Sequence, residues 1–174
     1  GVAVNGDGEA EASMGVDAQD HDGDCDLDLF VTHLSVESNT LYANDGDGWF
    51  VDQSNRSGLA APSVPFTGFG TGWFDADLDG DLDLFVVNGA VTPIAAQVAA
   101  GSRHPLRQRD QIWLNDGAGR YSEVMAVPAF QIEDVSRGAA LADLDNDGDQ
   151  DIVVMNNGGA ARIYQNNRNA PENP

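Results

Sequence analysis

Short apolar runs recur along the chain, and each one directly follows a polar stretch that is rich in aspartate. The runs consist mostly of residues that favour β-strands: Leu29-Phe30-Val31-Thr32, Leu84-Phe85-Val86-Val87 and Ile152-Val153-Val154-Met155. A stretch of small residues with a glycine precedes each aspartate-rich stretch. Strand-forming sequence on both sides of a polar loop predicts two strands that the loop connects.

A second pattern repeats between these loops. Leu41–Phe50 (LYANDGDGWF) matches Ile112–Tyr121 (IWLNDGAGRY) position by position. An Asn-Asp-Gly turn between alternating aromatic and aliphatic residues is a strong hairpin signal. The repeating unit is therefore strand, aspartate loop, strand, connection, strand, glycine turn, strand. Four antiparallel strands in this order form one blade of a β-propeller.

The pattern predicts an all-β chain that forms a single partial propeller domain over residues 1–174. Its four-stranded antiparallel blades are expected at about 14–53, 68–126 and 137–167. The last blade is expected to be incomplete, because a polar tail at 168–174 takes the place of a glycine turn and a fourth strand.

Two further segments carry expectations of their own. The longer connection of the second unit contains Thr92–Gly101, which predicts a short helix with Thr92 as its N-cap and Pro93 in its first turn. At the other end of the chain, Gly1–Val4 is interpreted as the end of a preceding blade. Such a strand could also complete the unfinished blade of a neighbouring chain.

The aspartate-rich loops place acidic residues at alternate positions. A loop that curls around a hard cation presents oxygen from alternate residues, and a glycine at its sixth position permits the sharp turn. These loops hold 15 of the 29 acidic residues of the chain. They are Asp20, Asp22, Asp24, Asp26 and Asp28; Asp75, Asp77, Asp79, Asp81 and Asp83; and Asp143, Asp145, Asp147, Asp149 and Asp151.

So many carboxylates in one loop repel one another unless a cation lies between them. Ligands that are all oxygen favour calcium over zinc or copper, and magnesium requires a tighter octahedron. We therefore expect about three Ca²⁺ ions, one in each loop. An EF-hand is excluded, because it needs a bidentate Glu at position 12, where these loops have Val31, Val86 and Val154.

The first loop departs from the pattern at one position. Cys25 stands where the other two loops have Gly80 and Gly148. If this position requires a positive φ, a side chain there costs about 1 kcal/mol. We therefore expect the first loop to be the weakest site, with Gly23 relieving part of the strain.

Charge and composition exclude several classes of function. The formal net charge is −21 with only eight Lys and Arg, so nucleic acid and anionic membranes are not expected as partners. No apolar run is long enough for a membrane span. Cys25 is the only cysteine and cannot form an internal disulfide.

No arrangement of residues typical of an enzyme is present, so the chain is not expected to be an enzyme. The three histidines are scattered, and His21, inside the first loop, is interpreted as a packing or surface residue. The tryptophans occupy strand or repeat-equivalent positions and are expected in the blade core rather than at a sugar-binding surface: Trp49, Trp73 and Trp113.

These stretches resemble known repeats. The loop and strand DADLDGDLDLFVV and the hairpin LYANDGDGWF resemble FG-GAP (VCBS-type) repeats, which form calcium-binding propeller blades in integrin α-subunits. Three longer stretches, MGVDAQDHDGDCDLDLFVTH, PFTGFGTGWFDADLDGDLDLFVVNGAV and RGAALADLDNDGDQDIVVMNNGGAARI, resemble bacterial secreted proteins of the ASPIC/UnbV group, to which animal cartilage acidic protein is related.

The resemblance implies which residues bind calcium. In the family pattern, positions 1, 3, 5 and 9 of each loop are side-chain ligands and position 7 binds through its backbone carbonyl. The implied side-chain ligands are Asp20, Asp22, Asp24 and Asp28; Asp75, Asp77, Asp79 and Asp83; and Asp143, Asp145, Asp147 and Asp151. The implied carbonyl ligands are Asp26, Asp81 and Asp149.

The resemblance also implies a function: an extracellular calcium-binding module, secreted to the periplasm or the cell surface of a bacterium. It would act as an adhesive scaffold for protein partners or as a fibre component that self-associates through open blade edges. The alternative is a module of a larger secreted protein that binds a carbohydrate or a peptide. A longer parent chain and self-assembly both remain open as the source of the blades that would close a ring.

Overall fold

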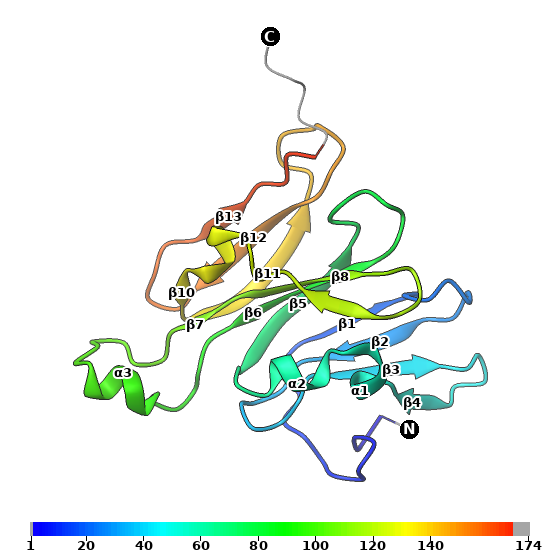
Figure 1. Ribbon diagram of the computed structural model, residues 1–174, viewed down its shortest axis with the longest axis horizontal. Coiled ribbons are helices and arrows are strands. Elements are labelled where there is room, and N and C mark those ends of the chain that lie inside the picture. The colour runs from blue at the N-terminus through cyan, green and yellow to red at the C-terminus, as the bar shows by residue number, and fades with distance from the viewer. Residues whose placement is uncertain (1, 169–174) are drawn as a thin grey trace.

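Within residues 2–168, which the computed structural model describes, three antiparallel sheets repeat the same order of strands (Figure 1). The first contains β1 (Val16–Gln19), β2 (Asp28–Val31), β3 (Thr40–Asn44) and β4 (Phe50–Asp52). The second contains β5 (Gly68–Phe74), β6 (Asp83–Asn88), β8 (Gln111–Asn115) and β9 (Tyr121–Glu123). The third contains β11 (Ser136–Ala142), β12 (Asp151–Asn156) and β13 (Arg162–Tyr164).

The predicted all-β architecture of antiparallel, four-stranded sheets is confirmed. The first two sheets are meanders in which each strand pairs with the next one of its unit. The third sheet has three strands within the described residues, and the predicted tail beyond Arg168 lies outside them.

Short elements connect the sheets. They are α1 (Ser54–Ser57), α2 (Ala60–Ser63), α3 (Ala95–Ala99), the 3₁₀-helix η1 (Pro128–Gln131), and a small sheet of β7 (Gln108–Arg109) and β10 (Glu133–Asp134). None of these helices is long and apolar enough to cross a membrane.

The helix expected in the long connection is present, but it starts later than the sequence pattern predicted. It begins at Ala95 with Ile94 as the N-cap residue, so Thr92 does not cap it. The returning chain sets this start, because the Ile94 N–H donates to Pro105 O at 2.7 Å and the Gln97 side chain bonds both the N–H and the carbonyl of Arg107.

The middle sheet is buried on both faces, which explains its uninterrupted apolar sequence. Successive side chains of a strand point to opposite faces. On β6, Leu84 and Val86 therefore enter the core shared with the first sheet, while Phe85 and Val87 enter the core shared with the third. All four are completely buried.

The strands β1, β5 and β11 lie side by side where the three sheets meet, with β5 in the middle (Figure 1). Glycine makes this close approach possible. A Cβ atom on Gly15 would lie 1.9 Å from Phe69 O, and one on Gly70 would lie 2.5 Å from Ala139 N. At the corresponding position of the third unit, a Cβ on Gly138 would have Met155 Cβ as its nearest contact among the described residues, at 3.9 Å.

Polar bonds also join neighbouring sheets. The Trp73 N–H donates to Asp17 Oδ2 at 2.9 Å, and the Thr32 hydroxyl donates to Phe69 O at 2.8 Å. Between the second and third sheets, the Arg137 guanidinium lies 4.1 Å from the Phe69 ring centre and donates to Gly89 O.

The segment before β1 contains no strand among its described residues, so the interpretation of Gly1–Val4 as the end of a preceding blade is wrong for residues 2–4. This segment instead lies against the first sheet. Tyr42 donates its hydroxyl to Val4 O at 3.1 Å, and the Thr40 hydroxyl donates to Glu11 Oε2 at 2.9 Å.

The tryptophans divide into two groups. Trp73 and Trp113 are buried in the core between the first two sheets, as expected. The expectation for Trp49 is wrong, because its side chain is 68% exposed. Trp49 ends the glycine turn before β4, at the position that Arg120 occupies in the second unit, and this position faces solvent.

Replacing Gly70 by alanine should destabilise the chain by about 1–3 kcal/mol, because the added Cβ would collide with the backbone of β11. The same change at Gly138 serves as the control and should stay within about 0.5 kcal/mol. Urea unfolding of both variants measures the difference. Equal midpoints for Gly70→Ala and Gly138→Ala would contradict the close approach of β5 and β11.

Candidate metal sites

Each aspartate-rich loop connects the first two strands of its sheet: β1 to β2, β5 to β6 and β11 to β12. In each loop the structure brings three carboxylates together, with one oxygen of each within 4.8 Å of the others. The groups are Asp20, Asp22 and Asp24; Asp75, Asp77 and Asp83; and Asp143, Asp145 and Asp147. Asp28 joins a further group with His21 and Asp22, so ten of the fifteen predicted residues lie in compact groups.

The first aspartate of each loop also shapes the backbone around it. Asp20 accepts hydrogen bonds from the N–H groups of Gly23, Asp24 and Cys25 at 2.8–3.1 Å. Asp75 accepts from Asp79 and Gly80 in the same way, and Asp143 accepts from Gly148. The loops are thus folded around the first aspartate by their own hydrogen bonds, and three carboxylates of each loop lie close together.

The prediction of a positive φ at the sixth loop position is confirmed in all three loops. Cys25 has φ 76°, and Gly80 and Gly148 both have φ 96°. The fourth position also has a positive φ: 77° at Gly23, 62° at Leu78 and 62° at Asn146.

Each loop therefore carries one residue with a side chain in the left-handed region. A left-handed side chain is therefore not peculiar to the first loop, and the expectation that this loop is the weakest site stays a prediction. Among the three, Asn146 tolerates this conformation best, because asparagine adopts it more readily than leucine or cysteine.

The ninth position has a structural role that sequence reasoning missed. Asp28, Asp83 and Asp151 are almost completely buried. One oxygen of each accepts the N–H of the second loop residue, at His21, Ala76 and Leu144 respectively (2.8–3.1 Å). The other oxygen accepts the N–H of an asparagine in the following hairpin, at Asn44, Asn115 and Asn166, each at 2.8 Å.

These asparagines connect one repeat to the previous one. The Asn166 side chain donates to Ala76 O in the second loop at 2.9 Å, and the Asn115 side chain makes a longer bond of 3.5 Å to His21 O in the first loop. A signal for them was present in the sequence, because an asparagine occupies the same place in all three hairpins.

Burial makes the ninth aspartate difficult to ionise. It raises the pKa of Asp83 to about 6, although the hydrogen bonds from Asn115 and Ala76 lower it. The neighbouring carboxylates of Asp77 and Asp79 raise it further. Burial likewise raises the pKa of Asp28. A nearby cation would stabilise the ionised form of such a group.

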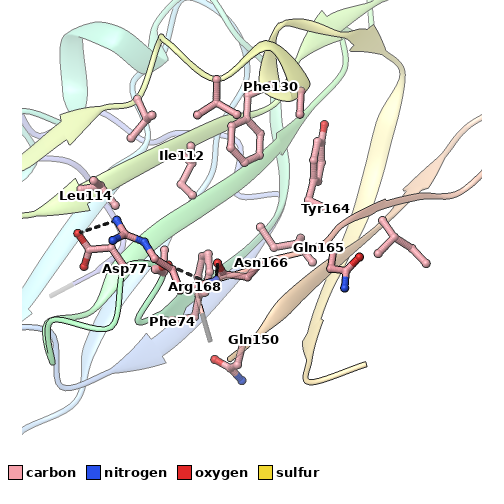
Figure 2. Close-up of a pocket in the computed structure, with 16 residues that line it drawn as sticks. Phe74, Asp77, Ile112, Leu114, Phe130, Gln150, Tyr164, Gln165, Asn166 and Arg168 are labelled. Carbon is pink, nitrogen blue, oxygen red and sulfur yellow. Dashed lines mark hydrogen bonds and ion pairs between the residues drawn. The ribbon is translucent and has the colours of Figure 1, made fainter. Parts of the chain in front are cut away.

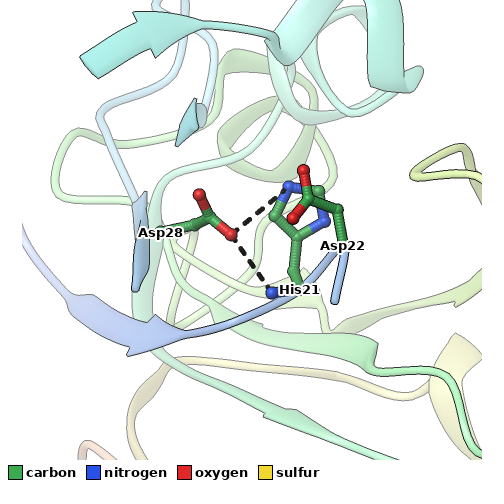
Figure 3. Close-up of side chains that lie close together, drawn as sticks. All are labelled: His21, Asp22 and Asp28. Carbon is green, nitrogen blue, oxygen red and sulfur yellow. Dashed lines mark hydrogen bonds and ion pairs between the residues drawn. The ribbon is translucent and has the colours of Figure 1, made fainter. Parts of the chain in front are cut away.

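His21 gives the first loop a different surrounding (Figure 3). Its imidazole is buried and lies beside Asp22 and Asp28, as Figure 3 shows. It also stacks on Trp73, with ring centres 6.1 Å apart and an angle of 5° between the planes. Its Nε2 lies 3.8 Å from Asp28 Oδ2, and Asp22 lies close enough for the three to form a further group of candidate ligands. His21 was expected to be a packing or surface residue, and the structure confirms the packing role.

The fold and its loops define an all-β repeat protein in which each repeat carries an aspartate-rich loop. The family model of the FG-GAP-like repeat matches residues 20–86 and 97–154, which together are more than half of the chain. The chain therefore belongs to the FG-GAP-like repeat family. A comparison with curated proteins found no match.

The burial of Asp28 separates its structural role from metal binding. Asp28→Ala should lower stability by about 2–4 kcal/mol even in a chelator, because the buried N–H of His21 and the partly buried N–H of Asn44 lose their acceptors. Asp22→Ala in the same loop should leave stability in chelator nearly unchanged, because Asp22 is exposed and accepts no hydrogen bond from the described residues. Thermal unfolding in chelator tests the pair. Equal losses for both variants would contradict the role of Asp28.

The left-handed residues predict how the loops respond to glycine. Cys25→Gly and Leu78→Gly should each favour the folded loop by about 1 kcal/mol, which is roughly a fivefold gain in metal affinity if the strain is relieved in the bound state. Asn146→Gly is the matched control and should gain less. Calorimetric titration of each variant with calcium measures this. A gain for Cys25→Gly alone would mean that only the sixth position is strained.

Proposed function

We propose that the chain is a calcium-binding interaction module that acts outside the cell. In this proposal the three sheets are consecutive blades of a β-propeller, and the ions bound in their loops make the blades rigid. The order of strands in each sheet and the position of β1, β5 and β11 side by side support the blade assignment.

The observation that carries the proposal is a pair of buried carboxylate oxygens. Asp77 Oδ1 and Asp147 Oδ2 are buried and have no hydrogen-bond partner among the described residues. Both belong to the compact aspartate groups. A buried anionic oxygen without a donor is costly, and a hard cation in the group would satisfy it.

The choice of calcium follows from the donors. The aspartate groups offer only oxygen, which disfavours zinc and copper, and magnesium requires a tighter octahedron than calcium does. Extracellular calcium modules typically bind at about 10⁻⁴ to 10⁻³ M, so such sites are filled where calcium is millimolar. This argument supports a place outside the cell, in the periplasm or at the cell surface.

The proposed role is that of an adhesive scaffold for protein partners, with no catalytic role. The contacts of the N-terminal segment favour this role over a self-assembling fibre. The segment around Val4 and Glu11 packs on the first sheet of its own chain. The part of that sheet around Thr40 and Tyr42 is therefore already covered. Within the family, we assign the chain to the ASPIC/UnbV group on the three loop-and-strand stretches quoted above.

Calcium should raise the melting temperature of the chain. If each loop binds with a Kd of about 0.1 mM, 1 mM calcium adds about 1.4 kcal/mol per site and about 4 kcal/mol in total. Scanning calorimetry with calcium, with magnesium and with chelator tests this, and titration calorimetry should give about three ions per chain.

The control is a variant with Asp22→Ala, Asp77→Ala and Asp145→Ala together, which removes the third position of every loop. Its melting temperature should respond far less to calcium. If the unchanged chain melts at the same temperature in calcium and in chelator, the proposed function is wrong.

A further inference from the structure

The first loop contains an imidazole that the other two loops lack. His21 stands at the second loop position, where the other loops have Ala76 and Leu144. Ala76 borders a cavity of about 370 Å³ between the second and third sheets, where Asp77 pairs with Arg168 of the same chain (Figure 2). The side chain of His21 is instead buried, with 3% of its surface exposed. The first loop therefore adds a buried nitrogen to its carboxylates.

The surroundings of the His21 ring fix which nitrogen carries the proton. The Tyr121 hydroxyl oxygen lies 3.4 Å from His21 Nδ1 and accepts a hydrogen bond from Trp73 Nε1. The single proton of this hydroxyl is donated to Leu82 O, at 3.2 Å. The contact between the hydroxyl and the ring therefore requires a proton on Nδ1, which donates to the hydroxyl oxygen. In a neutral imidazole the lone pair is then on Nε2.

His21 Nε2 faces a buried carboxylate and has no hydrogen-bond partner among the described residues. It lies 3.8 Å from Asp28 Oδ2, which is beyond hydrogen-bonding distance (Figure 3). Asp28 is completely buried, and both of its oxygens already accept backbone N–H groups. A lone pair and a carboxylate oxygen repel each other and are costly to bury together unless a cation lies between them.

Asp22 completes a group of three ligands. One ligand atom each of His21, Asp22 and Asp28 lies within 4.8 Å of the others. Zinc ligands lie about 2.1 Å from the ion, so two of them in a tetrahedral arrangement are about 3.4 Å apart. The 3.8 Å between Nε2 and Asp28 Oδ2 would shorten by about 0.4 Å to fit this arrangement. An imidazole nitrogen among the ligands suits zinc, whereas calcium prefers oxygen alone.

We propose that His21 Nε2, Asp22 and Asp28 bind a divalent transition metal ion such as Zn²⁺, which distinguishes the first loop from the other two. Asp22 is exposed at the surface of the loop, so solvent can reach the ion and supply a fourth ligand. The hydrogen bond from Nδ1 to Tyr121 orients the ring, as bonds to the second nitrogen do in other metal sites. The inference goes beyond the proposed calcium module and does not depend on calcium in any loop.

The proposed zinc site overlaps the candidate calcium group of the first loop, because both include Asp22. The compact groups found in the described parts of the second and third loops contain no nitrogen donor. Zinc should therefore bind at one site per chain, in the first loop.

Zinc titration of the full chain tests this inference. Competition with a chromophoric zinc chelator should give one zinc ion per chain. His21→Asn removes Nε2 but keeps an amide N–H that can donate to Tyr121. It should weaken zinc binding at least about tenfold, because even indirect partners of metal ligands contribute about 10–100-fold. His21→Phe, which keeps an aromatic ring beside Trp73, should weaken zinc binding by as much.

Two controls address other zinc ligands. His104 is exposed and belongs to none of the compact groups, so His104→Asn should change zinc affinity by less than about twofold. Cys25 is an exposed thiol of the same loop and also lies outside these groups, so Cys25→Ser should behave in the same way. Cooperative thermal unfolding in chelator shows which variants are folded.

A measurement on the unchanged chain removes any dependence on variants. Long-range ¹H–¹⁵N NMR of the imidazole rings reports the state of each ring nitrogen. Zinc should shift the Nε2 signal of His21, while Nδ1 keeps its proton and the signals of His33 and His104 stay in place.

Three results would overturn the inference. The first is equal zinc affinity of the unchanged chain and the folded His21 variants. The second is a loss of zinc binding in Cys25→Ser but not in His21→Asn, which would assign the ion to the thiol. The third is a His21 ring that keeps protons on both nitrogens in excess zinc, which would assign the place beside Asp28 to a proton.

The calcium response is measured separately, by the melting temperature. A chain that is stabilised by calcium but gives any of these three results keeps the proposed function and loses the zinc site. A chain that binds zinc through His21 but melts at the same temperature in calcium and in chelator keeps the zinc site and loses the proposed function.

Discussion

The fold depends on one buried carboxylate in each repeat. Asp28, Asp83 and Asp151 each use one oxygen to hold the loop and the other to hold the following hairpin, so that two turns far apart in sequence are fixed to one side chain. The arrangement has an electrostatic cost, because burial opposes ionisation and raises the pKa of Asp83 and Asp28. A cation in the adjacent loop would offset that cost, so the proposed ion and the observed hydrogen bonds would act on the same groups.

This constraint also couples neighbouring repeats. The asparagine whose N–H is held by the buried aspartate is positioned to donate its side chain to the loop of the preceding repeat, as Asn166 does to Ala76 O. The conformation of the loop in one sheet is thereby connected to the conformation of the hairpin in the next sheet. In repeat proteins, stability is approximately a sum of such intrinsic and nearest-neighbour contributions. Loss of order in one loop should therefore weaken the interface with the following sheet as well as its own sheet.

Much of this structure could be predicted from the sequence, because its repeated elements are local. The apolar runs after each loop and the Asn-Asp-Gly turns specify strands and hairpins from adjacent residues alone, and the positive φ at Cys25 follows from its alignment with Gly80. The burial of Asp83 could not be predicted in this way. From sequence alone, an aspartate in an acidic run is interpreted as a metal ligand. That its oxygens already accept backbone hydrogen bonds becomes apparent only when the hairpin is packed against the loop.

The other differences have a common cause, which is that tertiary contacts override weak local signals. The helix in the long connection begins at Ala95 because Pro105 accepts the N–H of Ile94, a contact between distant parts of the connection. Helices as short as α1 and α2 have no periodicity to detect. Trp49 is a large aromatic residue of the kind usually found in a core, but its position in the hairpin faces solvent.

The three loops differ in where they place the glycine that their backbone requires. Each loop requires two left-handed residues, at its fourth and sixth positions, but the glycine stands at the fourth position in the first loop and at the sixth in the other two. The backbone path is therefore retained while the residue that meets its conformational demand changes. One left-handed position in each loop still carries a side chain, so every loop keeps some strain, and the strain is smallest in the third loop, where that residue is Asn146. Differences in their affinity for an ion should then come mainly from their surroundings, such as the buried imidazole of His21.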